Sequence, residues 1–395
     1  PMPTHVLVVG GGIGGLSAAL ALSRGRHRVD VFEQAPVFAE IGAGIQMGPN
    51  VTRRLGQLGL AEGLEAIAAR PEALVVQSAG SGAELARLPL GDAMRERYGA
   101  PYFCVHRADL HSLLLEAVRA HGTGTLATDA RIAQVEAGDD LVCISSSGAR
   151  AWEGEALVGA DGLWSVARQR LDVPSAAEPP RATGHTAWRG MAEQAVLPQA
   201  LRRGRIDVWL GPRLHAVAYP VRGGAWLNVV VIAESAPAGD ARDWDQASSL
   251  AALQKATGRS GGALQALLEA MPGWRAWTLS DRPPLASAAE MAHERVALVG
   301  DAAHPMVPYL AQGAGMAIED SVALAEALGQ GDAADVPAAF ARYAEARWQR
   351  NALVQAKARR NGQIFHATGA VRIGRDLAMR TLGARLLDQP WLYAG

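Results

Sequence analysis

The stretch VLVVGGGIGGLSAALAL, from Val6 to Leu22, decides the fold of this chain. Its first four residues are apolar and mostly β-branched, which is typical of a short buried strand. Gly10, Gly12 and Gly15 then fit the pattern GxGxxG. In that pattern the first glycine makes a tight turn, the second lets the backbone approach a pyrophosphate, and the third lets the following helix pack on the strand. The small and apolar residues that come next predict a helix from Ser17 to Arg24.

A second strand and an acidic residue complete the same unit. Val29 to Phe32 predicts the strand, and Glu33 follows it, 23 positions after the first glycine of the pattern. A carboxylate at this distance accepts hydrogen bonds from the ribose of a dinucleotide, while free N–H groups at the start of the helix attract its phosphates. The whole unit predicts a dinucleotide site that includes Gly12, Gly14, Gly15 and Glu33. The glycine pattern alone is also compatible with a tight turn that binds nothing.

A second unit of strand, turn and helix lies far downstream, in GDAAHPMVPYLAQGAGMAIEDSVAL from Gly300 to Leu324. Val296 to Val299 predicts a buried strand, and Asp301 stands at its carboxyl end, where open α/β sheets bind ligands. Met316 to Leu328 predicts a helix. A nicotinamide dehydrogenase has no need of this second unit, whereas a chain that holds an extended FAD must also grip the flavin end. The two units together therefore favour FAD.

Composition and charge exclude several classes of protein. The chain has 395 residues and a formal net charge of −1, so we expect a folded protein without a basic surface for nucleic acid or an anionic membrane. Cys104 and Cys143 stand far apart, which argues against a disulfide framework and fits a reducing cytoplasm. The sequence has no HExxH motif and no paired cysteine and histidine spacing, so no metal site is expected. The apolar N-terminal stretch lacks a preceding basic region, so we expect neither a signal peptide nor a membrane span.

Three motifs along the chain resemble those of a known family, the single-component FAD-dependent aromatic hydroxylases, which are para-hydroxybenzoate hydroxylase-like flavoprotein monooxygenases. The first motif is GGGIGG with Glu33, the second is GADGLWSVAR with Asp161, similar to the family's DG motif, and the third is GDAAHP with Asp301, similar to its GD motif. The resemblance covers essentially the full length. The forms GIQMGPN and PYLAQGA look closest to salicylate and 3-hydroxybenzoate 6-hydroxylase relatives, because related 6-hydroxynicotinate hydroxylases often have histidine at the positions of Gln46 and Tyr309.

The resemblance implies an α/β fold with a Rossmann-like FAD-binding domain, an inserted mixed β-sheet substrate domain and a long C-terminal helix. We expect residues 1–75, 101–175 and 286–330 to form the discontinuous FAD-binding domain, residues 76–100 and 176–285 the substrate-binding domain, and residues 331–395 the C-terminal helical segment.

The C-terminal segment contains a long helical pattern that is rich in arginine and alanine, from Pro337 to His366. Its basic residues predict a solvated helix face, and a nicotinamide phosphate or partner site is the alternative. They are Arg347, Arg350, Lys357, Arg359 and Arg360.

The resemblance also implies where FAD is held. Arg107 would contact the pyrophosphate and ribityl region, and Asp301 would hold a ribityl hydroxyl. Asp161 is implicated in FAD and nicotinamide contacts, although its position after a strand is also compatible with turn and helix-cap chemistry. The N–H groups at Gly313 and Ala314 would point to the pyrimidine edge of the flavin, where a helix N-terminus stabilises the negative charge of the reduced form.

The substrate side is predicted from DVWLGPRLHAVAYPVRGGAWLNVVVIAE, which has the pattern of β-strands around a short RGG turn. Side chains alternate faces along a strand, so His215, Val217 and Tyr219 share one face. One interpretation is a core histidine with a hydrogen-bonded tyrosine. In phenol-activating relatives, a histidine and a tyrosine at this spacing bind or deprotonate the substrate hydroxyl. The resemblance therefore implies His215 as the base or a proton-relay member and Tyr219 as a hydrogen-bond partner.

Further substrate-binding candidates come from three other segments. They are Pro308, Tyr309 and Gln312 in the loop before the last helix of the second unit, with Gln46 and Tyr102 as weaker candidates that are equally compatible with core packing. A carboxylate on the substrate also needs a donor. The sequence does not single one out, because Arg53, Arg189 and Arg222 are equally compatible with surface positions.

The sequence thus predicts an enzyme that uses FAD, NADH or NADPH, and O2 to hydroxylate a small phenolic aromatic carboxylate of the salicylate or 3-hydroxybenzoate type. In the family's chemistry, reduced flavin and O2 form a C4a-hydroperoxide that reacts more readily with a phenolate than with a phenol, and a neutral histidine is a suitable base. The alternatives are an N-heterocycle hydroxylase of the 6-hydroxynicotinate or urate type, and a flavin reductase or dehydrogenase on the same fold. The choice between monomer and homodimer stays open.

Overall fold

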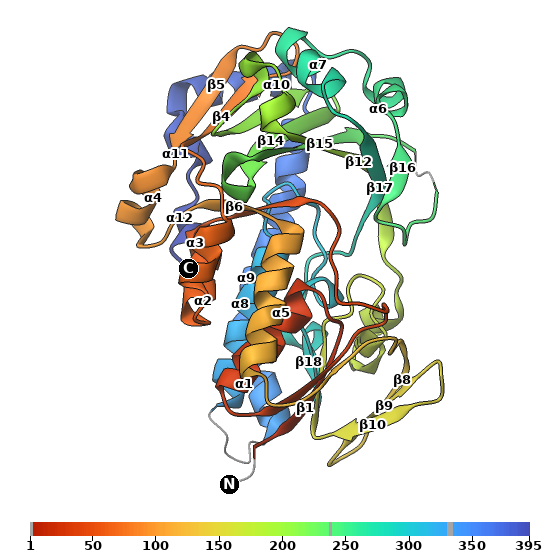
Figure 1. Ribbon diagram of the computed structural model, residues 1–395. Coiled ribbons are helices and arrows are strands. Elements are labelled where there is room, and N and C mark those ends of the chain that lie inside the picture. Colours follow the sequence, from red (N-terminus) through yellow and green to blue (C-terminus); the bar gives the residue numbers. More distant parts are fainter. Residues whose placement is uncertain (1–2, 237–238, 330–334) are drawn as a thin grey trace.

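The computed structural model describes residues 3–236, 239–329 and 335–395. Figure 1 shows one β-sheet region around β1 (His5–Val9) and a second around β14 (Leu214–Val221), with the 30-residue helix α9 (Val336–Phe365) running from one to the other. These layers have the predicted α/β class. The expected boundary between residues 330 and 331 lies outside the described residues.

The first region is built on a six-stranded sheet in the order β18-β19-β11-β1-β2-β7. Its strands run parallel except β18, which pairs antiparallel with β19 at the edge. The bounds are Arg28–Phe32 for β2, Leu126–Ala127 for β7, Ala156–Gly159 for β11, Ala292–His293 for β18 and Val296–Leu298 for β19. The helix after β1 is α1 (Ile13–Arg24), which begins at Ile13 rather than Ser17 because the glycine loop turns directly into it.

Helices cover this parallel sheet and bury its apolar strands. The helix α1 packs against both α5 (Arg107–His121) and α8 (Gly313–Leu328), and residues Val6, Leu7 and Val8 of β1 are fully buried. The remaining elements around this region are α2 (Pro49–Gln57), α3 (Ala61–Ile67), α4 (Gly91–Tyr98), the two-stranded sheet of β3 (Gly44–Met47) and β6 (Phe103–His106), and the three-stranded sheet of β8 (Ile132–Ala137), β9 (Val142–Ser146) and β10 (Ala151–Gly154).

The second region is an eight-stranded mixed sheet in the order β16-β17-β12-β15-β14-β13-β4-β5. Only the pair β13 and β4 is parallel among the described strands of this sheet. The bounds are Ala73–Ser78 for β4, Glu84–Pro89 for β5, Arg181–Glu193 for β12, Ile206–Gly211 for β13, Trp226–Glu234 for β15, Gln246–Ser248 for β16 and Trp274–Asp281 for β17.

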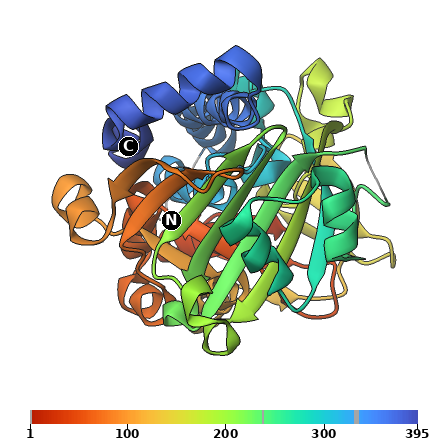
Figure 2. The same cartoon turned by 90° about the horizontal axis from the view of Figure 1, so that it is seen from above.

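The two faces of the eight-stranded sheet have different neighbours. Helices α6 (Leu250–Thr257) and α7 (Gly262–Glu269) pack on one face, where Ala216 and Ala218 of β14 join their apolar cluster. Figure 2 shows these two helices on the outer side of the sheet. The opposite face carries the alternate residues of β14 and is turned towards the first region. We call it the inner face.

The C-terminal helices link the two regions. The helix α9 packs on α8 and on β18 and β19, and its end reaches the inner face, where Ala358 lies in a cluster with Ala187 of β12. The chain then continues through α10 (Gly369–Leu382), α11 (Ala384–Leu387) and α12 (Pro390–Tyr393). Within the described ranges, every helix is too short or too polar to cross a membrane.

The solvated face predicted for the arginines of α9 is wrong for three of them. Arg347 is buried, and it donates to Asp320 Oδ1 at 2.8 Å and to Glu319 Oε1 at 3.0 Å. Arg350 donates to both oxygens of Glu319, and Arg359 binds Asp281. Burial acts to raise the pKa of Glu319, but the two arginines hold it below its usual value. The sequence pattern of α9 gave the wrong prediction because the acidic residues that bind these arginines lie in α8 and β17.

Replacing Arg347 with alanine tests how much this buried network stabilises the fold. We expect the Arg347→Ala variant to lose about 3–5 kcal/mol in the free energy of unfolding, because it removes the buried guanidinium that binds both Asp320 and Glu319. Arg360→Ala is the matched control on the exposed side of the same helix, and it should change stability by less than about 0.5 kcal/mol. Urea titrations of both variants measure the difference. Equal stability of the two variants would contradict the assignment.

Candidate active site

The glycine loop after β1 forms a cradle that requires glycine at two positions. Gly10 has a φ of +109°, and a Cβ there would lie 2.1 Å from the carbonyl oxygen of Ala160. A Cβ on Gly15 would lie 1.8 Å from the carbonyl oxygen of Gly10, so α1 packs against the turn itself. Gly12 is the N-cap of α1 and provides no side-chain hydrogen bond, so the first N–H groups of the helix are free to bind a phosphate.

Charged side chains lie at the rim of this cradle. Arg107 begins α5, and its Nε donates to Glu40 Oε2 at 2.9 Å. Glu40 Oε1 in turn lies 3.4 Å from the place that a Cβ of Gly12 would occupy. Glu33 follows β2, as predicted, and accepts a hydrogen bond from the N–H of Ala35 at 3.3 Å. Glu40 is a site residue that the sequence analysis missed, and no motif singled it out.

Asp301 and the start of α8 complete the cradle on the far side. Within the described residues, the Asp301 carboxylate has no hydrogen-bond partner, and burial raises its pKa although His304 and Arg107 act to lower it. The helix α8 begins at Gly313, three residues before the predicted start, and Gln312 at its N-cap makes no capping bond. Free helix N–H groups, the guanidinium of Arg107 and the carboxylate of Asp301 fit a dinucleotide cofactor with phosphates and hydroxyls.

The structure gives Asp161 a capping role. Its Oδ1 accepts a hydrogen bond from the hydroxyl of Ser165, and its Oδ2 accepts from the N–H groups of Val166 at 2.8 Å and Ala167 at 3.3 Å. These bonds satisfy the start of the short 3-10 helix Ala167–Arg170. Both carboxylate oxygens are therefore engaged within the protein, which favours the helix-cap interpretation of the DG motif over direct contact with a cofactor.

His215 and Tyr219 both lie on the inner face of the eight-stranded sheet, but they have different neighbours. The ring of Tyr219 lies 2.5 Å from the place that a Cβ of Gly44 would occupy, so Gly44 in β3 makes room for it. Burial raises the pKa of the Tyr219 hydroxyl, which stays protonated. His215 instead contacts His366, which follows the end of α9. His215 and Tyr219 therefore share the inner face of the sheet, but each has its own neighbours and no hydrogen bond joins the two side chains.

A cluster of histidines surrounds His215. Its Nδ1 lies 2.8 Å from Nε2 of His366, and Tyr309 Oη lies 2.7 Å from Nδ1 of His185. Burial lowers the pKa of His215 well below its ordinary value and that of His366 to about 4, and the neighbouring imidazoles lower both further. The rings are therefore neutral near pH 7. The hydrogen bond of His215 within the described part of the chain is made by Nδ1, so Nε2 is available as an acceptor.

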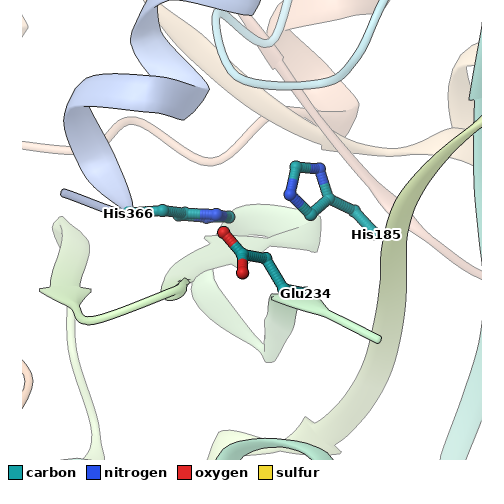
Figure 3. A group of neighbouring side chains, drawn as sticks. All are labelled: His185, Glu234 and His366. Atoms are coloured by element: carbon teal, nitrogen blue, oxygen red, sulfur yellow. The ribbon is translucent and has the colours of Figure 1, made fainter. Parts of the chain in front are cut away.

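A cavity of about 610 Å³ opens beside this cluster. His185, Glu234, Tyr309 and His366 line it, together with Asp281 and its partner Arg359. Figure 3 shows His185, Glu234 and His366 turned towards one another from three different segments. Tyr309 lines this cavity, while the neighbouring Pro308 is exposed, and the substrate-binding role of both stays a prediction.

The other predicted substrate residues are paired with each other or with the core. Tyr102 donates its hydroxyl proton to Gln46 Oε1 at 2.9 Å, across the pair β3 and β6. Gln312 is buried, and its Oε1 accepts from Asn50 Nδ2 at 3.1 Å, which fixes the orientation of its amide. These contacts hold the three side chains in place without placing them in the cavity beside His215.

Of the three arginines that the sequence left open, Arg189 is the one that is buried. It is only 4% exposed on the inner face, its Nη2 donates to Asp245 Oδ1 at 2.6 Å, and its Nη1 is buried without a partner. Arg222 instead binds Asp109 at the surface, and Arg53 donates to backbone carbonyls near the C-terminus. The motif AWRG was the available signal, because a strand interior seldom holds an arginine unless it is paired.

Comparisons with known proteins identify the family of this chain. The family model of the FAD binding domain matches residues 3–357. The chain is 39% identical over 100% of its length to the 3-hydroxybenzoate 6-hydroxylase of Polaromonas naphthalenivorans (strain CJ2), of which it covers 96%. It is 36% identical to the 6-hydroxynicotinate 3-monooxygenase of Bordetella bronchiseptica, over 89% of each chain.

The fold also matches a solved structure. Klebsiella pneumoniae HpxO, complexed with FAD and uric acid, aligns with a TM-score of 0.84 and 26% identity over 97% of this chain and 94% of that one. The family model, the named relatives and this structural match together confirm the predicted fold, cofactor and enzyme class. The chain therefore belongs to the FAD binding domain family, and it is an FAD-dependent aromatic hydroxylase.

Proposed function

We propose that this enzyme consumes NADH or NADPH and O2 to hydroxylate a phenolic aromatic carboxylate, with a 3-hydroxybenzoate as the favoured substrate and salicylate as its nearest competitor. Three relatives named 3-hydroxybenzoate 6-hydroxylase, at 36–39% identity over at least 98% of this chain, support the substrate class. The single observation that carries the proposal is the placement of His215, a neutral and buried imidazole whose Nε2 is free on the inner face.

The residues of the cradle would hold FAD. The N-terminus of α1 beyond Gly12 would bind the pyrophosphate, Arg107 would lie beside it, and the carboxylate of Asp301 would accept from a ribityl hydroxyl. The free N-terminus of α8 would face the flavin ring. When bound, FAD supplies the redox chemistry, in which O2 is activated and one oxygen atom enters the aromatic ring.

His215 would activate the phenol. A phenolate directs more electron density to its ortho and para carbons than a phenol does, so removal of the hydroxyl proton favours attack by an electrophilic oxygen. The hydrogen bond to His366 leaves Nε2 of His215 as the acceptor when Nδ1 carries the proton. Burial disfavours the protonated, positively charged form of His215. The negative phenolate oxygen beside the ring would stabilise that form after the proton is transferred.

Arg189 would bind the substrate carboxylate. Its Nη1 is buried without a hydrogen-bond partner, and a substrate carboxylate would accept that hydrogen bond. A buried guanidinium group is stabilised when its donors are paired, and a charged acceptor makes the stronger bond. Trp277 supports the guanidinium at 5.2 Å from its ring centre, and Asp245 fixes its other side. A ligand that spans His215 and Arg189 therefore carries a hydroxyl at one end and an anionic group at the other.

Turnover against a panel of aromatic compounds tests the proposed function. FAD-loaded protein is mixed with NADH or NADPH and with 3-hydroxybenzoate, salicylate, 6-hydroxynicotinate or urate, and product and hydrogen peroxide are quantified. We expect hydroxylated product in step with nicotinamide oxidation for a hydroxybenzoate. Product from only an N-heterocycle would move the assignment to that class, and nicotinamide oxidation without product from any compound would favour a reductase.

Replacing His215 with asparagine tests its role as the base. The turnover number for product formation should fall by about 10²–10⁴-fold, because the acceptor for the phenolic proton is lost. FAD content and the rate of flavin reduction by the nicotinamide should stay close to wild type, since the cradle is untouched. His121→Asn, at the exposed end of α5, is the matched control. An unchanged turnover number in His215→Asn would refute the assignment.

Replacing Arg189 with methionine tests carboxylate recognition. The KM for the hydroxybenzoate should rise by about 10- to 100-fold, since a hydrogen bond to a charged group contributes about 1.5–3 kcal/mol. The KM for 3-hydroxybenzyl alcohol, which lacks the carboxylate, should change little, and this comparison separates recognition from damage to the fold. The control variant is Arg222→Met at the surface. Equal losses for both compounds would point to a structural role for Arg189.

A further inference from the structure

Three side chains converge beside the cavity, and the proposed reaction uses only one of them, His366, as the hydrogen-bond partner of His215. His185 on β12 and Glu234 on β15 face each other across paired strands, and His366 reaches them from the end of α9. One ligand atom from each lies within 4.8 Å of the other two. Figure 3 shows a ring nitrogen of His185 and a carboxylate oxygen of Glu234 turned towards the ring of His366.

Each imidazole in this group has one nitrogen engaged and one left over. Nδ1 of His185 is held by the hydroxyl of Tyr309 at 2.7 Å, which leaves Nε2 for the shared space. Nε2 of His366 is held by His215 at 2.8 Å, and its Nδ1 is buried with no partner in the described residues. Histidines that bind a metal are oriented in this way, with the second nitrogen hydrogen-bonded to a neighbouring group.

The local charge also suits a cation. The hydrogen bonds of His185 and His366 each engage one ring nitrogen, so the other nitrogen of each ring is left to bind an ion. Glu234 supplies a negative charge and is exposed, so its carboxylate is free to reorient. The two arginines that line the cavity, Arg181 and Arg359, are bound to Asp281 at 3.2 Å and 2.9 Å. Arg375 on α10, whose charge also acts on His366, is bound to Asp376 at 2.9 Å.

We propose that His185, Glu234 and His366 form a binding site for a divalent transition-metal ion of the zinc type. Two imidazoles and one carboxylate match the ligand set of zinc sites that keep a fourth position for water, and the cavity provides the water and the entry path. Tetrahedral bonds of about 2.0–2.2 Å require ligand atoms about 3.4 Å apart. Rotation of the exposed Glu234 side chain would shorten the two distances between its carboxylate and the imidazoles.

An ion at this site would disable His215, and this second part rests on the proposed function. With the metal on Nδ1 of His366, the remaining ring proton must sit on Nε2 and be donated to Nδ1 of His215. His215 then carries its own proton on Nε2 and no longer accepts the phenolic proton. The ion acts as an inhibitor that changes no contact of FAD and holds the base in the wrong tautomer.

Metal binding is measured directly on the FAD-loaded protein after treatment with a chelator. Zinc is titrated by calorimetry, and cobalt(II) is added in parallel because a tetrahedral site with nitrogen and oxygen ligands gives it visible absorption beyond the flavin bands. We expect one ion per chain. Glu234→Gln should weaken zinc binding by at least about tenfold. Glu193→Gln, an exposed residue at the end of β12, is the matched control and should bind as the wild type does.

Absence of binding in the wild type, or equal affinities for the Glu234→Gln and Glu193→Gln variants, would overturn the site. Flavin absorbance and the melting temperature confirm that each variant is folded. His185→Asn serves as a second ligand variant should Glu234→Gln be unstable, and it should also lose at least about tenfold in zinc affinity.

The effect on His215 is measured as a loss of turnover number at saturating zinc. Hydroxylation should fall about 100-fold or more, in line with the loss of a general base, while flavin reduction stays unchanged. Chelator should restore the wild type, and Glu234→Gln should resist the zinc. Normal turnover of a zinc-loaded enzyme would reject the inhibitory part. Failure of every compound in the panel would reject the proposed function and leave the binding result standing.

Discussion

The buried charges of Glu319, Asp320 and Arg347 fix the positions of the turn that carries Asp301, of α8 and of α9 relative to one another. Asp320 accepts a hydrogen bond from the N–H of Gly300 at 3.0 Å and contacts His304, so it ties the turn that carries Asp301 to α8. Arg347 ties α8 to α9. Because α9 continues to the eight-stranded sheet, the same network sets where His366 meets the inner face. A pair of this kind favours one arrangement strongly, since any other leaves a charge buried alone.

The buried polar groups near the middle of α9 are charged, whereas those at its C-terminal end are neutral. Near its middle, carboxylates and guanidinium groups are buried together, and each stabilises the ionised form of its partner. At its end, His215 and His366 are buried and His185 is half-buried, and burial lowers the pKa values of all three histidines, which favours their neutral forms. A neutral imidazole is an acceptor with a free lone pair. The same cluster therefore suits a base for a phenol and, on its other side, ligands for a metal ion.

The sequence predicted best those features that depend on neighbours in the chain. The glycine cradle needs a turn and a helix start within a few residues, and Glu33 follows at a distance set by one strand, one helix and the next strand. Alternation along β14 placed His215 and Tyr219 on one face. Two roles of Asp161 stayed open at the level of the sequence, because a carboxylate that caps a helix and one that contacts a cofactor occupy the same kind of position after a strand. The hydrogen bonds of its side chain distinguish the two roles.

Contacts between segments that lie far apart in the chain could not be predicted from the sequence. Arg189 and Asp245 are 56 residues apart, and nothing near either of them reveals that the arginine is buried with one donor free. The arginines of α9 looked solvated because their acidic partners lie on other elements.

The sequence by itself determined the cofactor, the family and the layout of strands and helices, since these depend on local turns, alternation and motif order. Tertiary structure alone decided that His185, Glu234 and His366 share one space, because three segments must fold together before their side chains meet.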